Sequence, residues 1–219
     1  MTARPEHGWP PPQPDLSLEQ AYWQVGIISV GGIDEAGRGA WAGPVSAGVV
    51  VLPPDPNLAL ALHGVRDSKQ MTPIQRTAWA AQIKSAAAAW GVGMASHQEI
   101  DALGILPATR LAAGRALAAL PFSPEVLILD WLDLPQAPLP QTALVKGDGR
   151  ALSISCASVL AKTTRDALLV ELDALYPAYG FAAHKGYGTA AHQAALRLYG
   201  PCPIHRLSFK PLLQCSTVN

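Results

Sequence analysis

Short apolar runs separated by turns rich in glycine and proline predict the strands of this protein. Residues 25–33 and 45–52 are apolar and rich in β-branched side chains, which favour extended structure. A glycine-rich turn joins them, so we expect two antiparallel neighbours. Residues 126–129 (VLIL) are apolar without interruption, as in a buried strand with parallel neighbours. Two further short strands are predicted at residues 91–96 and 142–145.

Longer segments between these runs predict helices. Residues 73–90 follow Thr72, a residue type common at helix N-caps, and Pro73 suits the first helical position. An antiparallel strand pair followed by alternating strands and helices predicts an α/β protein with helices packed on a mixed sheet. The other predicted helices are residues 107–120, 153–175 and 189–198.

The composition describes a neutral protein with enough apolar material for a sizeable core. The 219 residues are 49% hydrophobic and 15% charged, with a formal net charge of zero. This balance argues against overall charge as the way of finding a polyanion, but it allows a local basic face. The cysteines Cys156, Cys202 and Cys215 form no CxxC pair, which disfavours structural zinc. Their odd number and the lack of a signal-peptide pattern predict a reducing cytoplasm, and no apolar stretch reaches the roughly 18–20 residues that span a bilayer.

Acidic residues stand where apolar strands are predicted to end. Asp34 and Glu35 follow the first strand, Asp130 follows VLIL, and Asp148 lies in KGDG after the last strand. Ligands bind at strand ends in open α/β sheets, and converging carboxylates suit Mg²⁺ or Mn²⁺. Taken singly, each aspartate is more often a turn residue. Because successive strand side chains alternate between faces, Glu35 joins Asp34 by its side chain only if the strand has turned; otherwise it offers its main-chain carbonyl.

The segment Gly37-Arg38-Gly39 leaves main-chain N–H and C=O groups uncovered. Such groups can approach a ligand closely and can read a hydroxyl, because they both donate and accept hydrogen bonds. The glycines alone favour a simpler explanation, a hairpin turn that needs positive φ. The dinucleotide-binding pattern G-x-G-x-x-G is absent.

Beyond Asp173 the chain has basic residues and no acidic ones, which predicts a local phosphate-binding surface. Tyr187 lies there between two glycines, so its ring either stacks on a base or sugar or is partly buried. Lys69 is either a phosphate contact or a solvated loop lysine. The basic and histidine residues of this region are Lys185, Arg197, Arg206, Lys210, His184, His192 and His205.

Taken together, these segments resemble the ribonuclease HII family, the type 2 ribonucleases H. In chain order they are GIDEAGRGAWAGPV, DSKQMTPIQR, VLILD, VKGDGR, SISCASVLAKTTRD, HKGYGT and PIHRLSFKP. The resemblance implies a ribonuclease H-like α/β fold, with a mixed five-stranded sheet flanked by helices and a C-terminal helical part. It implies a catalytic domain over residues 17–213, between a disordered proline-rich leader (residues 1–16) and a tail (residues 214–219).

The resemblance also implies an activity. It is the endonucleolytic hydrolysis of RNA in RNA–DNA hybrids and at single ribonucleotides in duplex DNA. The cut lies on the 5′ side of the ribonucleotide and leaves a 3′-hydroxyl and a 5′-phosphate. Such a metal-dependent enzyme removes ribonucleotides and primers from DNA. The sequence does not give the oligomeric state, and a monomer is the default expectation.

The resemblance assigns roles to particular residues. Two divalent ions, Mg²⁺ or Mn²⁺, are held by the catalytic carboxylates of Asp34, Glu35, Asp130 and Asp148. The glycine segment reads the 2′-hydroxyl, Tyr187 stacks on the following deoxyribose, and basic side chains contact phosphates. The implied substrate-binding residues are Gly37, Arg38, Gly39, Lys69, His184, Lys185 and Tyr187.

One departure and several alternatives remain. Trp131 follows the third carboxylate where the family usually has glycine, which leaves the local turn open. Ribonuclease HIII, which needs runs of ribonucleotides, typically carries an N-terminal binding domain for which the leader is too short. A non-catalytic hybrid-binding module would not need four strand-end carboxylates. A phosphate-binding regulatory protein would bind nucleotides without metal.

Overall fold

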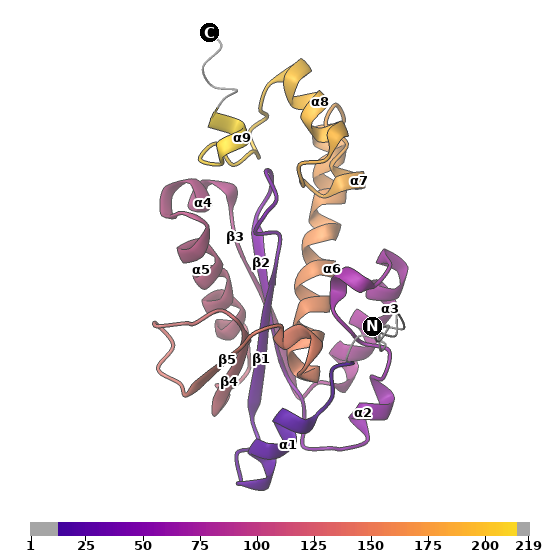
Figure 1. Cartoon of the computed structure of the whole chain (residues 1–219), viewed down its shortest axis with the longest axis vertical. Helices are drawn as coiled ribbons and strands as arrows, with labels where there is room; N and C mark the ends of the chain where they lie inside the picture. Colours follow the sequence, from indigo (N-terminus) through magenta and orange to yellow (C-terminus); the bar gives the residue numbers. More distant parts are fainter. Residues whose placement is uncertain (1–12, 214–219) are drawn as a thin grey trace, which may run out of the picture.

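The computed structural model describes residues 13–213 and contains a mixed five-stranded sheet with helices on both faces (Figure 1). The strand order is β3-β2-β1-β4-β5. The predicted fold class is therefore confirmed. The strands are β1 (Val30–Ala36), β2 (Val45–Val51), β3 (Ala89–Ala95), β4 (Val126–Asp130) and β5 (Gln141–Leu144).

The central strand β1 joins the antiparallel and parallel parts of the sheet. It pairs antiparallel with β2 and parallel with β4, as predicted for both. Ile33 lies opposite Leu129 in the parallel ladder, so the next residues, Asp34 and Asp130, come side by side. β4 ends at Asp130 while β1 continues to Ala36. The register therefore places two acidic residues together at the edge of the sheet.

The first strand begins later than predicted. Val25 and Gly26 continue the last turn of helix α1 (Ser17–Gln24) through hydrogen bonds to the carbonyl oxygens of Tyr22 and Trp23. Continuous burial starts only at Val30. The apolar residues before it therefore connect a helix to the sheet instead of extending the strand.

Helices α5 (Ile105–Ala118) and α6 (Leu152–Leu175) cover the two faces of the sheet (Figure 1). Gly32 and Gly48 allow α6 to approach β1 and β2 closely. A Cβ atom at Gly32 would stand 2.3 Å from Ser153 Oγ, and one at Gly48 would stand 2.4 Å from the carbonyl oxygen of Ala157. The long helix predicted at residues 153–175 is thus confirmed, and it packs directly on the central strands.

The other predicted helices are present with shifted bounds. In α3 (Pro73–Ala86), Thr72 forms the expected cap by accepting a hydrogen bond from Gln75 N. The helix ends before the predicted residue 90 because the chain there pairs with β2 as part of β3. The remaining helices are α2 (Leu58–Ala61), η1 (Ser68–Gln70), α4 (His97–Leu103), η2 (Gly147–Gly149), α7 (Phe181–His184), α8 (Ala190–Tyr199) and α9 (Lys210–Leu213).

The folded part begins before the predicted end of the leader. Asp15 N donates a hydrogen bond to the carbonyl oxygen of Arg150, and Leu16 is 1% exposed in the core. Asp15 and Leu16 therefore belong to the folded part. The rest of the predicted leader up to residue 12, and the predicted tail at residues 214–219, lie outside the described residues. Between residues 13 and 213, no helix is long and apolar enough to cross a bilayer.

Glu19 of α1 stabilises the start of α6. The N-cap residue of α6, Ala151, has no side chain that can accept a hydrogen bond. Instead, the buried Glu19 Oε1 accepts hydrogen bonds from Ser153 N at 2.8 Å and from Ser153 Oγ at 2.6 Å. This contact satisfies an N–H group that the helix itself leaves unpaired.

We expect Glu19→Ala to lower the free energy of unfolding by about 1–3 kcal/mol, because Ser153 N–H would stay buried without a partner. Urea unfolding followed by circular dichroism measures this loss. Gln24→Ala, at an exposed position of the same helix, is the control and should change it by less than about 0.5 kcal/mol. Equal losses in the two variants would show that Glu19 does not act as a cap.

Candidate active site at the edge of the sheet

The ends of β1 and β4 and the start of α6 bring the predicted carboxylates together. Asp34 lies in β1, Asp130 ends β4, and Asp148 lies in η2 directly before α6. Asp130 Oδ1 accepts a 2.8 Å hydrogen bond from Gly147 N, which links β4 to η2. Lys69 Nζ lies 3.6 Å from Asp148 Oδ2. Residues far apart in the sequence therefore meet at one edge of the sheet, as predicted.

Asp34 and Glu35 point to opposite faces of β1. Both lie inside the strand, paired with Gly48 and Ala47, so the chain has not turned at Glu35. Asp34 faces α6, because Gly32, two residues before it on the same face of β1, lies directly against Ser153 of that helix. Strand alternation therefore places the Glu35 side chain on the other face.

Burial and mutual repulsion oppose the joint ionisation of these carboxylates. Asp34 is 4% exposed, and its pKa is raised well above the usual value by burial and then by the charge of Glu35. Burial also raises the pKa of Glu35 and of Asp148. Asp34 Oδ2 and Glu35 Oε2 are buried without a hydrogen-bond partner. The residues on the Asp34 side therefore fit a hard divalent cation, which would satisfy Asp34 Oδ2 and offset the negative charge gathered there.

The carboxylates are not arranged around a single point as they stand. Among residues 13–213, no three Asp, Glu, His or Cys side chains form a ready metal-binding cluster. Carboxylates that repel each other have a physical reason to stay apart. The charge of a cation would have to draw them together.

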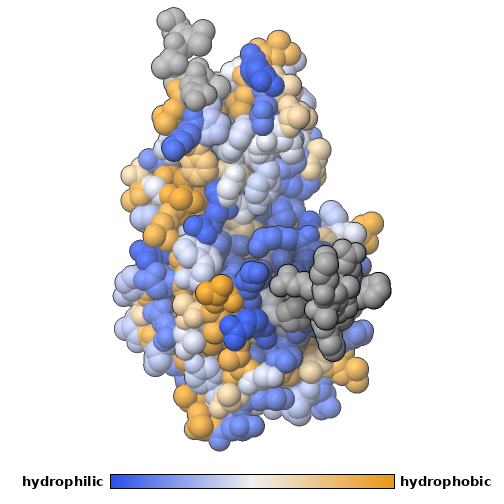
Figure 2. All heavy atoms as spheres, viewed as in Figure 1, coloured by the Kyte–Doolittle hydropathy of each residue, from blue (hydrophilic) through white to orange (hydrophobic). Residues whose placement is uncertain are grey.

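A cavity of about 690 Å³ lies beside these acids. Asp130 and Asp148 line it together with the cationic side chains of Lys69, Lys146 and Arg150. Hydrophilic side chains also gather in the middle of the molecular face seen in Figure 2. A phosphodiester needs both kinds of group, with acids to hold metal and cations to contact phosphate oxygens.

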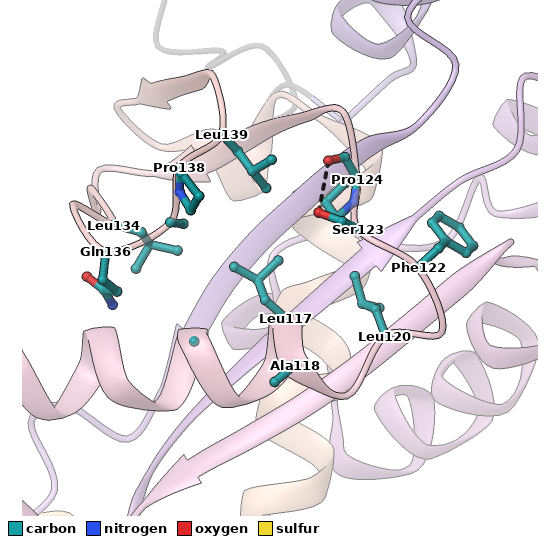
Figure 3. Close-up of a pocket in the computed structure, with 12 residues that line it drawn as sticks. Leu117, Ala118, Leu120, Phe122, Ser123, Pro124, Leu134, Gln136, Pro138 and Leu139 are labelled. Atoms are coloured by element: carbon teal, nitrogen blue, oxygen red, sulfur yellow. Dashed lines mark hydrogen bonds between the residues drawn. The ribbon is translucent and has the colours of Figure 1, made fainter.

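A second cavity has a different character. It is about 520 Å³ in volume and lies between the end of α5 and the loop before β5 (Figure 3). Leu117, Leu120, Phe122, Leu134 and Leu139 line most of it, and none of its lining residues is ionisable. It therefore contributes nothing to the predicted chemistry.

Trp131, directly after Asp130, has a backbone conformation that favours glycine. Its φ angle is 50°, in the left-handed region that favours glycine. The indole Nε1 donates a 3.2 Å hydrogen bond to Glu35 Oε1, and Arg38 Cζ lies 3.9 Å from the ring centroid. Arg38 Nη1 also lies 3.4 Å from Glu35 Oε1. The local turn at Trp131 is thus a left-handed one, and the Trp131 side chain adds contacts across the site.

Two buried arginines hold the glycine segment. Arg206 donates to the carbonyl oxygens of Arg38 at 2.8 Å and of Gly43 at 2.9 Å. Arg165 Nε donates to the carbonyl oxygen of Pro44 at 2.8 Å. Both guanidinium groups are fully buried. They fix the loop between β1 and β2 to the C-terminal part and to α6.

The two glycines of this segment differ in what they require. Gly37 has a φ angle of 89°, and a Cβ atom there would stand 2.0 Å from Arg165 Nε. A Cβ atom at Gly39 would meet nothing within 4 Å. The fold therefore requires glycine at position 37. The bare backbone at Gly39 faces open space, where a ligand backbone can approach.

Tyr187 lies on the same side as this loop and is half-buried. Lys162 Nζ lies 5.2 Å from the centroid of its ring, and Arg165 Cζ lies 5.6 Å from it. Cations over the ring stabilise it electrostatically. The predicted stacking residue is thus held against α6 with part of its surface accessible.

His184 and Lys185 are already engaged in the C-terminal part. His184 Nε2 lies 2.7 Å from the carbonyl oxygen of Tyr179, and His184 Nδ1 accepts a 3.2 Å hydrogen bond from Gly186 N. Lys185 Nζ donates to the carbonyl oxygen of Ala182. A phosphate contact by His184 would require one of its hydrogen bonds to break, whereas Lys185 Nζ keeps two further N–H donors for such a contact.

The basic region is less of a surface than predicted. His192, His205 and Arg206 are at most 1% exposed, because main-chain and imidazole partners bind them inside the C-terminal part. They cannot belong to a phosphate-binding surface. Sequence reasoning also missed the anchoring roles of Arg165 and Arg206. For Arg206, the lack of acidic residues after Asp173 was an available signal; for Arg165, which is followed by Asp166, it was not.

Comparisons with known proteins show what the whole chain is similar to. The sequence model of the family "Ribonuclease HII" matches residues 31–212. A ribonuclease HII of Roseiflexus castenholzii is 52% identical over 94% of this chain and 92% of its own. One of Thermus thermophilus is 50% identical over 90% of this chain and 93% of its own. The structure of the ribonuclease H2 of Pyrococcus horikoshii superposes with a TM-score of 0.72 at 27% identity, covering 86% of this chain and 97% of that one.

We expect Asp34→Asn to raise the melting temperature near neutral pH in EDTA, by about 2–4 °C for each kcal/mol of relieved repulsion and desolvation. Because folding raises the pKa of Asp34, its charge destabilises the protein above that raised pKa. The gain should therefore shrink as the pH falls and vanish below the ordinary value of 3.8. Thermal unfolding at several pH values measures this.

Glu171→Gln is the matched control, since it also changes an acid to an amide, at an exposed position of α6. It should leave the melting temperature nearly unchanged at every pH. A lower melting temperature for Asp34→Asn near neutral pH would contradict the strain assigned to this carboxylate.

Proposed function

The chain belongs to the ribonuclease HII family, whose members are endoribonucleases acting on RNA–DNA hybrids, and we propose that it nicks duplex DNA at single embedded ribonucleotides. The cut lies 5′ of the ribonucleotide and leaves a 3′-hydroxyl and a 5′-phosphate. Its role is the removal of ribonucleotides and primers from DNA. One observation carries the proposal: repelling, partly unpaired carboxylates gather beside a bare glycine segment that buried arginines hold in place.

The residues of the chain suggest how a metal would be held. Asp34, Asp130 and Asp148 would bind through their side chains. Glu35 would bind through its main-chain carbonyl, since its side chain lies on the other face of β1 and is bonded to Trp131. When bound, two Mg²⁺ or Mn²⁺ ions would activate a water for attack and offset the charge on the leaving 3′-oxygen.

The protein itself would bind and orient the substrate. Main-chain groups of the segment from Gly37 to Gly39 would hydrogen-bond the 2′-hydroxyl, which DNA lacks. Tyr187 would stack on the next deoxyribose. Lys69 is placed to contact a phosphate: although burial opposes its charge, Asp67 and Asp148 raise its pKa overall and keep it protonated. Recognition and cleavage would thus share one short stretch of backbone.

We expect the protein to cut duplex DNA carrying one ribonucleotide in Mg²⁺ at the 5′ side of that nucleotide. The all-DNA duplex should stay intact, and EDTA should stop the reaction. Asp130→Asn should lower the rate by about 10²–10³-fold, as when one group that stabilises transition-state charge is removed. Product mapping on a sequencing gel, with end-group analysis, measures both outcomes.

The alternatives predict other results in the same assay. Cleavage restricted to runs of ribonucleotides would indicate a ribonuclease HIII-like substrate range. Hybrid binding without cleavage in Mg²⁺ or Mn²⁺ would indicate a binding module. Equal cleavage of the all-DNA duplex would refute the proposal that the protein recognises the 2′-hydroxyl.

We expect Tyr187→Ala to lower kcat/KM on the single-ribonucleotide duplex by about 5–150-fold, the equivalent of 1–3 kcal/mol for a lost stacking contact. Tyr187→Phe keeps the ring and should keep most of the activity. Tyr199→Ala, at an exposed position of α8, is the control. Unchanged kinetics for Tyr187→Ala would remove the ring from the substrate site.

A further inference from the structure

The main chain around Tyr187 is held from several directions. Tyr187 N donates to the carbonyl oxygen of His184 at 2.9 Å, and the carbonyl oxygen of Tyr187 lies 3.0 Å from His192 Nδ1. The carbonyl oxygen of Gly186 accepts a 2.8 Å hydrogen bond from Trp41 N, in the loop that follows the glycine segment. The position of the Tyr187 ring is therefore set by these partners of its backbone.

His192 and His205 form a buried pair behind this loop. Their Nε2 atoms lie 3.0 Å apart, and the two residues are 0% and 1% exposed. Cys202 N donates a 2.9 Å hydrogen bond to His205 Nδ1. A continuous chain of hydrogen bonds thus runs from Cys202 through both imidazoles to the carbonyl oxygen of Tyr187. We call this chain the histidine relay.

The partners determine where the protons of the histidine relay lie. The Tyr187 carbonyl can only accept, so His192 Nδ1 carries a hydrogen. A neutral His192 then accepts at Nε2, which requires His205 Nε2 to donate. His205 Nδ1 is left to accept from Cys202 N, as observed. His205 Nδ1 also lies 3.1 Å from the carbonyl oxygen of Cys202, but that oxygen accepts a 3.0 Å hydrogen bond from His205 N. One arrangement of neutral rings therefore gives every N–H group of the chain an acceptor.

A second proton would break this arrangement. On His192 Nε2, the added proton would face the N–H group of His205 Nε2. On His205 Nδ1, it would remove the acceptor of Cys202 N–H. Burial lowers the pKa of His192, and it lowers the pKa of His205 to about 4. His184, stacked on His192 at 4.4 Å between centroids, also disfavours added charge there. The histidine relay is thus neutral near neutral pH.

Arg206, the residue after His205, binds the glycine segment. Arg206 donates to the carbonyl oxygen of Arg38, in the glycine segment. The dipeptide His205-Arg206 is therefore linked to Tyr187 through His192 and to the glycine segment directly. Its position fixes how far apart the two predicted sugar-reading elements stand.

We propose that His192 and His205 are positioning residues that set Tyr187 against the sugar after the ribonucleotide and so determine selectivity for the RNA–DNA junction over a uniform hybrid. The inference rests on the proposed function, in which Tyr187 stacks on that sugar. Neither histidine touches the substrate. A uniform hybrid has no junction at most cleavage positions, so its cleavage depends less on Tyr187.

A double-mutant cycle tests the proposal. We expect His192→Leu to lower kcat/KM on the single-ribonucleotide duplex by about 10-fold or more, mainly through KM, within the range for a lost stacking contact. Cleavage of a uniform RNA–DNA hybrid should fall by less than about 3-fold. In a Tyr187→Ala background, His192→Leu should add less than about 2-fold, because coupled residues are not additive.

Matched variants distinguish a positioning role of His192 from a general loss of folded structure. His192→Asn keeps a donor near the place of Nδ1 and should retain activity on the junction within about 3-fold of the wild type, since hydrogen bonds of this kind are modest. His63→Leu changes an exposed histidine and serves as the control. Additive losses of His192→Leu and Tyr187→Ala, or equal losses on both substrates, would overturn the proposal. Failure of the wild type to nick the junction duplex would instead refute the proposed function.

The proton positions give a readout that does not depend on any variant folding. In ¹⁵N-resolved spectra of the wild-type protein near neutral pH, His192 should be the Nδ1–H tautomer and His205 the Nε2–H tautomer. The opposite tautomers, or a doubly protonated ring, would show that the histidine relay does not hold Tyr187.

Discussion

Like charges held side by side are the constraint on which the rest of this structure depends. The β1–β4 register brings Asp34 next to Asp130, and α6 covers Asp34 so that its charge is buried as well as repelled. Burial of an uncompensated charge is costly. The packing around these carboxylates therefore has to resist the repulsion between them. The glycine contacts between α6 and the central strands, and the Glu19 cap at the start of α6, supply that resistance.

The two buried arginines near the site bind backbone carbonyl oxygens. Arg165 and Arg206 are buried, and the hydrogen bonds of their guanidinium groups go to loop carbonyl oxygens. A guanidinium presents several donors in a fixed plane, so a single side chain can satisfy carbonyls from separate loops. These loops need such partners because they form few ladder hydrogen bonds of their own. The arginines thus fix the backbone and keep positive charge near a site for phosphates.

The sequence predicted what depends on local pattern and missed what depends on distant partners. The apolar runs, the cap at Thr72 and the strand-end acids are local signals, and the sheet and the gathering of carboxylates followed from them. Helix α1 gave no such signal, because its buried residue is the charged Glu19, whose partner lies at the start of α6. Composition predicts a surface position for Arg206 and His205, because it counts charges but does not reveal which carbonyls and imidazoles bind them. The orientation of the Glu35 side chain depends on whether β1 continues through Glu35, and only the pairing of β1 with β2 decides this.

The contacts of Trp131 show that the acidic residues of the site differ in the partners that stabilise their charge. A non-glycine residue at positive φ costs about 1–3 kcal/mol. Here the indole N–H and the stacked Arg38 guanidinium both bind the Glu35 carboxylate. Asp34 is 4% exposed, and burial and the charge of Glu35 raise its pKa well above the usual value. The need for a cation is therefore greatest at Asp34. Glu35 Oε1 is already bonded and the Glu35 side chain lies on the other face of β1, which leaves the main-chain carbonyl of Glu35 as the group that can serve a metal on the Asp34 side.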